Sequence, residues 1–184
     1  MPILKQFTPS LTPDQKRSIV AAYAKYVFLY NEILSISSKT RSESYYKRFE
    51  ENIINEIISS VKFRFVYDMP DSIINMAIID ALNALSLFHL SDDDFPRRKQ
   101  VGKTASFYVK EGIQTLPYTS KTIISIENVC DNIILSGHKY YPEPITRIDI
   151  FFKNERMFYF KITFADKNQF KKDLSLFCQS MSTR

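Results

Sequence analysis

The sequence predicts an α+β fold dominated by helices, in which an N-terminal half of three helices precedes a mixed half. Three observations lead to this class. Apolar residues recur at helical spacing through the first half of the chain. They alternate with polar residues over 147–164, as in a β-hairpin. A charged stretch at 92–99 separates the two patterns. We therefore expect a single domain over residues 1–184, subdivided into a helical half (1–91) and a mixed half (97–184).

The first helix is predicted to begin at Pro13. Thr12 and Gln15 have the spacing of a capping box, and proline is favoured at the first helical position. Apolar side chains then recur on one face of the helix. This predicted inner face consists of Ile19, Tyr23, Tyr26, Val27, Tyr30, Ile33 and Leu34.

Two more helices are predicted in the N-terminal half. One runs from about Ser42 to about Ser60, and the alternating residues 61–67 fit either a short strand or the end of this helix. The other follows a turn at 68–71 and has the most apolar face of the chain. That face consists of Ile73, Ile74, Ala77, Ile78, Ala81, Leu82, Leu85 and Phe88.

The middle of the chain gives a less regular pattern. Residues 100–118 are ambiguous between helix and strand, and Gly102 and Gly112 weaken a helix there. A fourth helix is expected from Thr119 or Ser120 to a C-terminal cap at Gly137. Its predicted inner face consists of Ile123, Ile126, Cys130, Ile133 and Ile134.

The C-terminal pattern is a hairpin with one apolar face. Its turn is predicted at 153–156, and its inner residues are Ile148, Ile150, Phe152, Phe158, Phe160, Ile162 and Phe164. Two strands alone are marginal in water, so this face needs a cover. A terminal helix that begins near Asp166 is predicted to supply it. The apolar stripe of that helix contains Phe170, Leu174, Phe177, Cys178 and Met181.

Glycine is scarce, with three residues in 184. A phosphate-binding loop needs clustered glycines, so that backbone N–H groups can approach the ligand. The pair Gly102-Lys103 lacks the required glycine five residues earlier, where Arg97 stands. These observations exclude the common nucleotide-binding loops, and we predict no cofactor.

No metal site is predicted either. Asp149 and Lys161 match part of a metal-dependent nuclease pattern, but the second acid is missing because Tyr159 occupies its position. We expect Asp149, Lys161 and Arg147 to be cross-strand charges on the exposed side of the hairpin. The run of aspartates at 92–94 lacks the spacing and the glycine turn of a calcium loop.

Catalytic chemistry has one weak candidate pair. Cys130 and His138 resemble a nucleophile and a base, yet Cys130 falls on a predicted inner face, where cysteine is usually an inert small hydrophobe. Cys178 has the same interpretation, and whether either thiol is free stays open. We predict no catalytic residues and favour a non-enzymatic protein.

Positive charge and aromatic residues coincide in the C-terminal half. The chain has a net charge of +5, and residues 96–184 hold 15 basic and 8 acidic groups. Within the hairpin, Tyr159 and Phe151 are expected to project outward beside the charges. The candidate interaction surface consists of His138, Lys139, Tyr140, Tyr141, Arg147, Lys153, Arg156, Tyr159 and Lys161.

Two functions follow as hypotheses. The first is a protein-interaction module, because the sequence holds no credible catalytic or cofactor constellation. The 22 Ile and 16 Lys against 8 Ala indicate an AT-rich gene, which fits an accessory protein of a mobile element such as a toxin-neutralising immunity protein or inhibitor. The alternative is nucleic-acid binding through the basic C-terminal half. A dispersed enzyme site around His138, Cys130 or the aspartates that begin at Asp92 is a third interpretation.

The setting is predicted to be cytoplasmic. Residues 1–10 lack the features of a secretory signal, and no apolar run approaches the roughly 18 residues that span a bilayer. The partner, the organism and the oligomeric state stay open.

Overall fold

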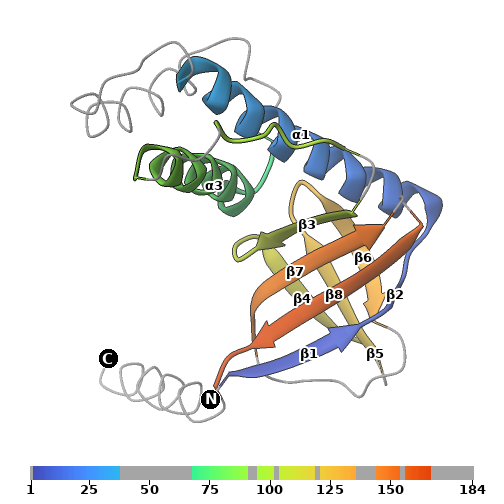
Figure 1. Cartoon of the computed structure of the whole chain (residues 1–184). Helices are drawn as coiled ribbons and strands as arrows, with labels where there is room; N and C mark the ends of the chain where they lie inside the picture. The colour runs from blue at the N-terminus through green and yellow to red at the C-terminus, as the bar shows by residue number, and fades with distance from the viewer. Residues whose placement is uncertain are drawn as a thin grey trace, which may run out of the picture.

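Strands dominate the structure. The computed structural model describes residues 2–37, 68–90, 95–101, 104–118, 121–135, 144–153 and 156–166. Within these ranges the chain forms two helices and eight strands. The prediction of a helix-dominated fold with a three-helix half is therefore wrong. The described chain is a strand-rich α+β protein (Figure 1).

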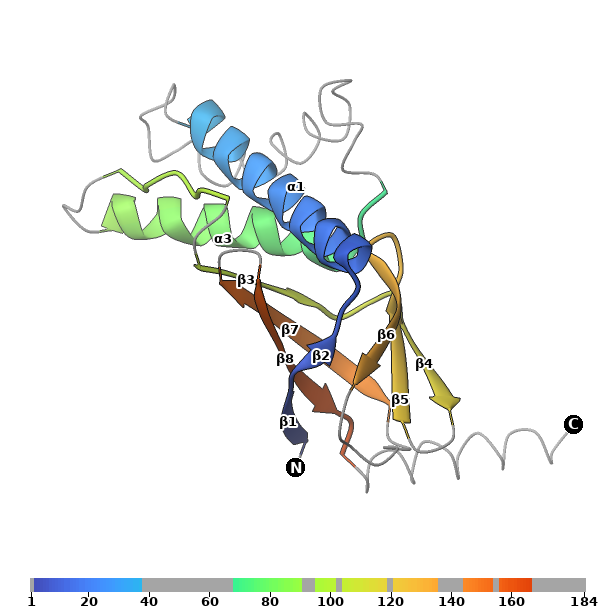
Figure 2. The ribbon, with the colours of Figure 1, turned by 90° about the vertical axis from the view of Figure 1, so that its right-hand side faces the viewer.

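The strands form two antiparallel sheets of four strands each. Sheet A has the order β1-β8-β7-β3, and sheet B has the order β2-β6-β5-β4. The bounds are Ile3–Phe7 (β1), Pro9–Ser10 (β2), Thr104–Val109 (β3), Ile113–Tyr118 (β4), Lys121–Ile126 (β5), Cys130–Leu135 (β6), Ile145–Lys153 (β7) and Met157–Phe164 (β8). Sheet B lies behind sheet A, and the helices cross one end of both sheets (Figures 1 and 2).

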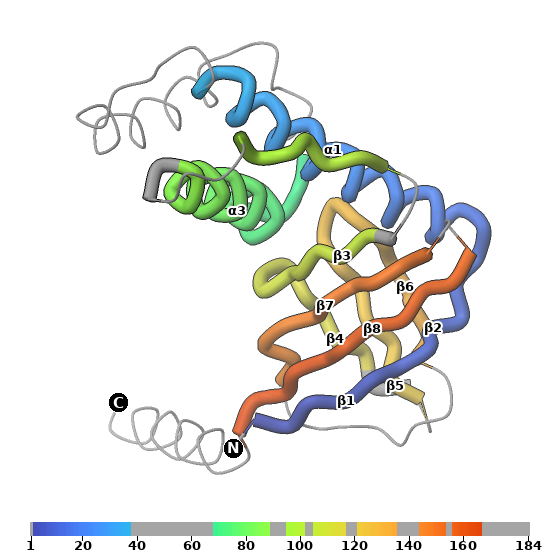
Figure 3. The backbone as a smooth tube through the Cα atoms, viewed as in Figure 1, coloured from blue at the N-terminus to red at the C-terminus, as the bar shows by residue number. Residues whose placement is uncertain are grey.

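The chain passes directly from one sheet to the other at two edges. Only Thr8 separates β1 from β2. Figure 3 shows the chain running from β1 through β2 into the first helix. At the opposite edge a short turn joins β3 to β4. Gly112 in that turn has a φ of 65°, and a Cβ on it would lie 2.9 Å from the Cβ of Glu127. A side chain here would be strained and would clash, so this turn requires glycine.

The predicted first helix is confirmed as α1, Pro13–Ser37. The backbone N–H of Thr12 donates to Gln15 Oε1 at 2.9 Å, and the backbone N–H of Gln15 donates to Thr12 Oγ1 at 3.2 Å. These two bonds are the predicted capping box. Every residue of the predicted inner face is buried. The Gln15 amide also donates to the carbonyls of Asp131 and Asn132, which ties the start of α1 to β6.

The predicted third helix is confirmed as α3, Asp71–Leu90. Lys25 of α1 donates to Asp68 at 2.7 Å, just before α3 begins, and this bond lowers the pKa of Asp68. The helix predicted at 42–60, the alternating segment 61–67 and the predicted terminal helix lie outside the described residues.

Both helices are long and apolar enough to cross a membrane by length and composition. In the 18-residue apolar stretch of each helix, half of the residues of α1 and 39% of those of α3 are buried within the fold. Core helices of soluble proteins pass the same test, so these helices are weak candidates for membrane spans.

The fourth helix predicted from Thr119 or Ser120 is wrong. The segment forms the hairpin β5–β6, in which Ile123 pairs with Ile134 and Ile124 pairs with Ile133. β-Branched residues such as isoleucine favour a pleated sheet, and they are dense here. Asn128 turns the chain with a φ of 57°, a conformation that asparagine tolerates better than most residues. Gly137, the predicted cap, lies outside the described residues.

The predicted C-terminal hairpin is confirmed as β7 and β8. Ile150 pairs with Phe160, and Phe152 pairs with Phe158, on the buried side. Sheet B and α1 cover this apolar face within one continuous core. Tyr23 of α1 contacts Phe152 edge-on, with 5.3 Å between ring centroids.

Candidate functional site

The side of sheet A that faces away from sheet B is the main candidate surface, and Figure 1 looks onto it. Residues alternate along β7 and β8, so the neighbours of the buried core residues project outward. We call this surface the outer face. Its residues on the two central strands are Arg147, Asp149, Phe151, Lys153, Met157, Tyr159, Lys161 and Thr163.

Two aromatic rings stack at the centre of the outer face. Phe151 of β7 lies directly opposite Tyr159 of β8 in the sheet register. Their ring centroids are 4.7 Å apart and their planes are inclined by only 3°. Both side chains are half-buried, so each ring retains contact with solvent.

Cationic groups flank the aromatic stack. Lys161 Nζ lies 5.1 Å from the Phe151 ring centroid, and the Arg147 guanidinium lies 4.2 Å from that of Tyr108 on β3. Lys110 Nζ lies over the same Tyr108 ring at 5.5 Å. A cation over an aromatic face keeps its charge, so Lys161 and Lys110 remain available to an anion, whereas Arg147 is paired with Asp149.

Negative charge on the outer face is limited to Asp149, the sole carboxylate on the described strands of sheet A. Asp149 lies opposite Lys161 in the register, as expected for a cross-strand pair. Its hydrogen bond, however, comes from Arg147 of the same strand, whose Nε donates to Oδ1 at 2.8 Å. The carboxylate charge is therefore compensated within the surface itself.

A groove of about 580 Å³ borders the aromatic stack. Tyr159, Met157 and Arg156 form one wall, Gln6 and the start of β2 form the other, and Lys16 of α1 reaches the end. Tyr159 stacks on Phe151 and also lines the groove, so the two-ring stack ends at the groove wall.

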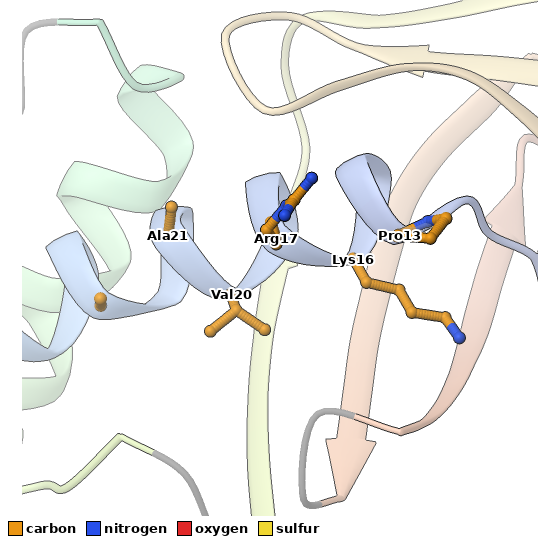
Figure 4. A pocket seen from close by; sticks show the side chains of 6 residues that line it. Pro13, Lys16, Arg17, Val20 and Ala21 are labelled. Atoms are coloured by element: carbon orange, nitrogen blue, oxygen red, sulfur yellow. The ribbon is translucent and has the colours of Figure 1, made fainter.

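Lys16 connects the groove to the surface of α1. It also lines a second hollow, of about 480 Å³, beside Pro13, Arg17 and Val20. In Figure 4 its side chain extends below the α1 ribbon, whereas that of Arg17 extends above it. Arg17 is paired with Asp14, whereas Lys16 has no ion pair within the described ranges.

Five of the nine predicted interface residues lie on this surface. Arg147, Lys153, Tyr159 and Lys161 share the outer face, and Arg156 lies at the adjoining groove. His138, Lys139, Tyr140 and Tyr141 lie outside the described residues.

Sequence patterns alone did not reveal Lys16, Gln6 and Tyr108. Tyr108 follows the alternation of residues 104–109, which identifies it once that segment is recognised as a strand. Lys16 and Gln6 carry no comparable signal, because only the pairing of β1 with β8 brings the N-terminus here.

A second polar cluster lies between the helices. The Tyr26 hydroxyl donates to Asp80 Oδ2 at 2.5 Å, and Lys99 Nζ donates to the same oxygen at 3.0 Å. Lys99 Nζ also lies 4.6 Å and 4.5 Å from the ring centroids of Tyr26 and Tyr30. Asn31 exchanges two hydrogen bonds with the Lys99 backbone, which fixes residues 95–101 along α1.

Acidic side chains gather away from the outer face. Asp71, Glu111 and Glu127 line a hollow of about 230 Å³ at the β3–β4 turn. Within the described ranges, no group of three or more His, Cys, Asp or Glu residues is arranged to hold a metal ion.

Cys130 is buried on β6, and burial together with the charge of Asp131 raises the pKa of its thiol to about 11. The thiol is therefore protonated at neutral pH, which agrees with the core interpretation of this residue. Its proposed partner His138 is not among the described residues.

Comparison with known proteins adds no assignment. No protein-family model matches the chain, and no curated protein matches it.

Proposed function

We propose that this chain is a cytoplasmic protein that binds single-stranded nucleic acid on the outer face of sheet A. The observation that carries the proposal is the Phe151–Tyr159 stack, which is flanked by cations and ends at a groove. Bases stack on exposed aromatic rings of antiparallel sheets, and basic side chains attract the phosphate backbone.

Single strands fit this surface better than a duplex. Each base in a single strand has a free face, whereas the bases in a duplex are already stacked on one another. Tyr159 is half-buried, and among the described rings only that of Phe151 stacks on it. A base that enters the groove extends the stack by one ring.

Charge separation over the molecule supports the same proposal. Arg147, Lys153 and Lys161 project from the outer face, where Asp149 is already paired with Arg147. The acidic hollow of Asp71, Glu111 and Glu127 lies at the β3–β4 turn and not on the outer face. An approaching polyanion therefore meets mainly positive charge on the outer face.

Fluorescence anisotropy with labelled strands of about 20 nucleotides, longer than one such site would cover, tests the proposal. The full chain is titrated into single-stranded and duplex oligonucleotides at several salt concentrations. We expect tighter binding to the single strand, with an affinity that falls steeply as salt increases. Replacing the ring in Tyr159→Leu should weaken binding about tenfold, because one stacked base is worth about 1–3 kcal/mol.

Two variants serve as controls for that experiment. Tyr159→Phe keeps the ring and should bind like the original chain. Lys121→Gln removes an exposed lysine from sheet B and should bind better than Lys161→Gln, which removes one from the outer face. No binding at low salt, or equal binding by Tyr159→Leu and Tyr159→Phe, would contradict the proposal.

A protein partner, such as a toxin encoded beside this chain, is the second proposal. It is favoured by Leu4 and Met157, which are 61% and 68% exposed on the outer face side of β1 and β8. Exposed apolar side chains are common at protein interfaces. Leu4→Ser with Met157→Ser should then release the coexpressed partner in size-exclusion chromatography, while a retained partner would refute this proposal.

A further inference from the structure

We infer that the groove between the start of α1 and the start of β8 is a phosphate subsite, formed by Lys16 and Arg156, for the backbone of the bound strand. This inference rests on the proposed function and extends it to a site outside the sheet. The phosphate is that of the nucleotide whose base stacks on Tyr159, since the ring and both cations line one groove.

The two cations come from distant parts of the sequence. Lys16 lies in the first turn of α1, and Arg156 lies between β7 and β8. The pairing of β1 with β8 brings these segments together, and both side chains line the groove. Neither has an ion pair to any residue that the structure describes.

The rest of the groove suits an anion. None of its lining residues in the described part of the chain is a carboxylate, and Gln6 and Ser10 add neutral side chains that can donate hydrogen bonds. Arginine offers several N–H groups in a planar fork that matches a phosphate, and lysine adds a point charge. Two cations without ion pairs to the described residues, close to such donors, constitute a phosphate-binding set without any glycine loop.

The groove is also large enough for its ligand. Its volume of about 580 Å³ lies within the range of roughly 300–1,000 Å³ that is typical of ligand sites. A nucleotide with its base on Tyr159 therefore has room for its phosphate toward Lys16. In this arrangement Tyr159 stacks on the base, and Lys16 and Arg156 neutralise the phosphate.

Salt dependence separates these two roles. For single strands, each phosphate that a protein neutralises contributes about 0.7 to the slope of log affinity against log salt. The variant K16Q/R156Q removes both cations from this one phosphate, so we expect this slope to fall by about 0.7. Tyr159→Leu should weaken binding and leave the slope unchanged.

The matched control is K5Q/K121Q, which removes two exposed lysines that lie outside the groove. It changes the net charge equally, so a comparable decrease of the slope in this variant would show a general charge effect and would overturn the subsite. Thermal unfolding of both double variants is measured in parallel. All four positions are at the surface, so both variants should fold.

Competition identifies the source of the phosphate. Inorganic phosphate, a mononucleotide and an unlabelled strand of about 12 nucleotides, enough to cover one binding site, are each titrated against the labelled strand. We expect displacement only by the unlabelled strand at micromolar concentration. Equal displacement by the mononucleotide or by inorganic phosphate would overturn the assignment to a backbone phosphate.

The outcomes also distinguish failure of the subsite from failure of the proposed function. If Tyr159→Leu weakens binding but K16Q/R156Q keeps both affinity and slope, the subsite is wrong and the proposed function stands. If the original chain binds no single strand, both are wrong.

Discussion

Two regions of this molecule combine the same chemical groups and differ in solvation. The helix cluster of Tyr26, Tyr30, Asp80 and Lys99 unites a carboxylate, a cation and aromatic rings between α1 and α3. The outer face combines Arg147, Asp149, Lys161, Phe151 and Tyr159 in a similar set.

Burial gives the two sets different consequences. Tyr26 is buried, and Lys99 and Asp80 keep 32% and 39% of their side-chain surface exposed. The hydroxyl, the carboxylate and the ammonium group of the helix cluster bond to one another. On the outer face the rings are half-exposed and no element of the described chain covers them. The first set stabilises the fold, whereas the second is available to a ligand.

The largest effect is expected from Lys99→Met. The change leaves Asp80 and the Tyr26 hydroxyl without their cation, and hydrogen bonds to charged groups are worth about 1.5–3 kcal/mol. Because both charges are about one-third exposed, we expect a loss of about 2 kcal/mol in the free energy of unfolding, measured by urea denaturation.

The matching change on the outer face is Lys161→Met, which should stay within about 0.5 kcal/mol of the original stability. Equal losses for Lys99→Met and Lys161→Met would remove the distinction between the two regions.

The second effect concerns binding. F151L/Y159L removes both stacked rings from a surface that is partly solvated, so we expect stability to fall by only about 1 kcal/mol, as for one cross-strand aromatic pair. Affinity for a single strand should fall tenfold or more, as measured by anisotropy. Lys99→Met, assayed at a temperature where it is folded, should bind like the original chain. The reverse ranking of the two variants in binding would contradict the comparison.

Local patterns in the sequence predicted several elements correctly because they depend on neighbouring residues. The capping box at Thr12 and Gln15 needs only a spacing of three, and the alternation in β7 and β8 is a property of each strand.

The segment 121–135 misled the helical interpretation. Ile123, Ile126, Ile133 and Ile134 fit a helical face as well as a pair of strands, and the turn at Asn128 lacks the usual Asn-Gly signature. Strands β1 and β2 were not predicted because their partners, β8 and β6, are more than a hundred residues away in the sequence.

The candidate site, like the fold, was predictable only where its residues are close in the sequence. Arg147, Lys153, Tyr159 and Lys161 lie on one strand pair, so alternation alone places them together. Lys16 joins Arg156 only through the long-range pairing of β1 with β8, which no local pattern reveals.

A third prediction uses alkaline pH to probe the helix cluster. Burial, followed by the bond to Asp80, raises the pKa of Tyr26 well above its usual value near 10. Above about pH 10 the unfolded chain loses this proton and the folded protein keeps it, so the free energy of unfolding falls as pH rises. At pH 11 this loss amounts to about 1.4 kcal/mol for one tyrosine.

Tyr26→Phe should therefore show a smaller decrease in stability between about pH 9 and pH 11 than the original chain, as measured by urea denaturation at each pH. Tyr159→Phe is the matched control on the outer face, and it should keep the decrease that Tyr26 causes. A decrease in Tyr26→Phe as large as that of the original chain would show that the helix cluster does not hold this proton.

The smallest effect is expected from Asp149→Asn on the outer face. The amide oxygen can still accept the hydrogen bond from Arg147, so stability should stay within about 0.5 kcal/mol. The change removes the only carboxylate on the described strands of this face and frees the Arg147 charge for a phosphate. Affinity for a single strand should rise about two- to threefold, and the salt slope should increase by at most about 0.7. Weaker binding by Asp149→Asn would mean that the carboxylate itself contacts the ligand, which a phosphate backbone would not favour.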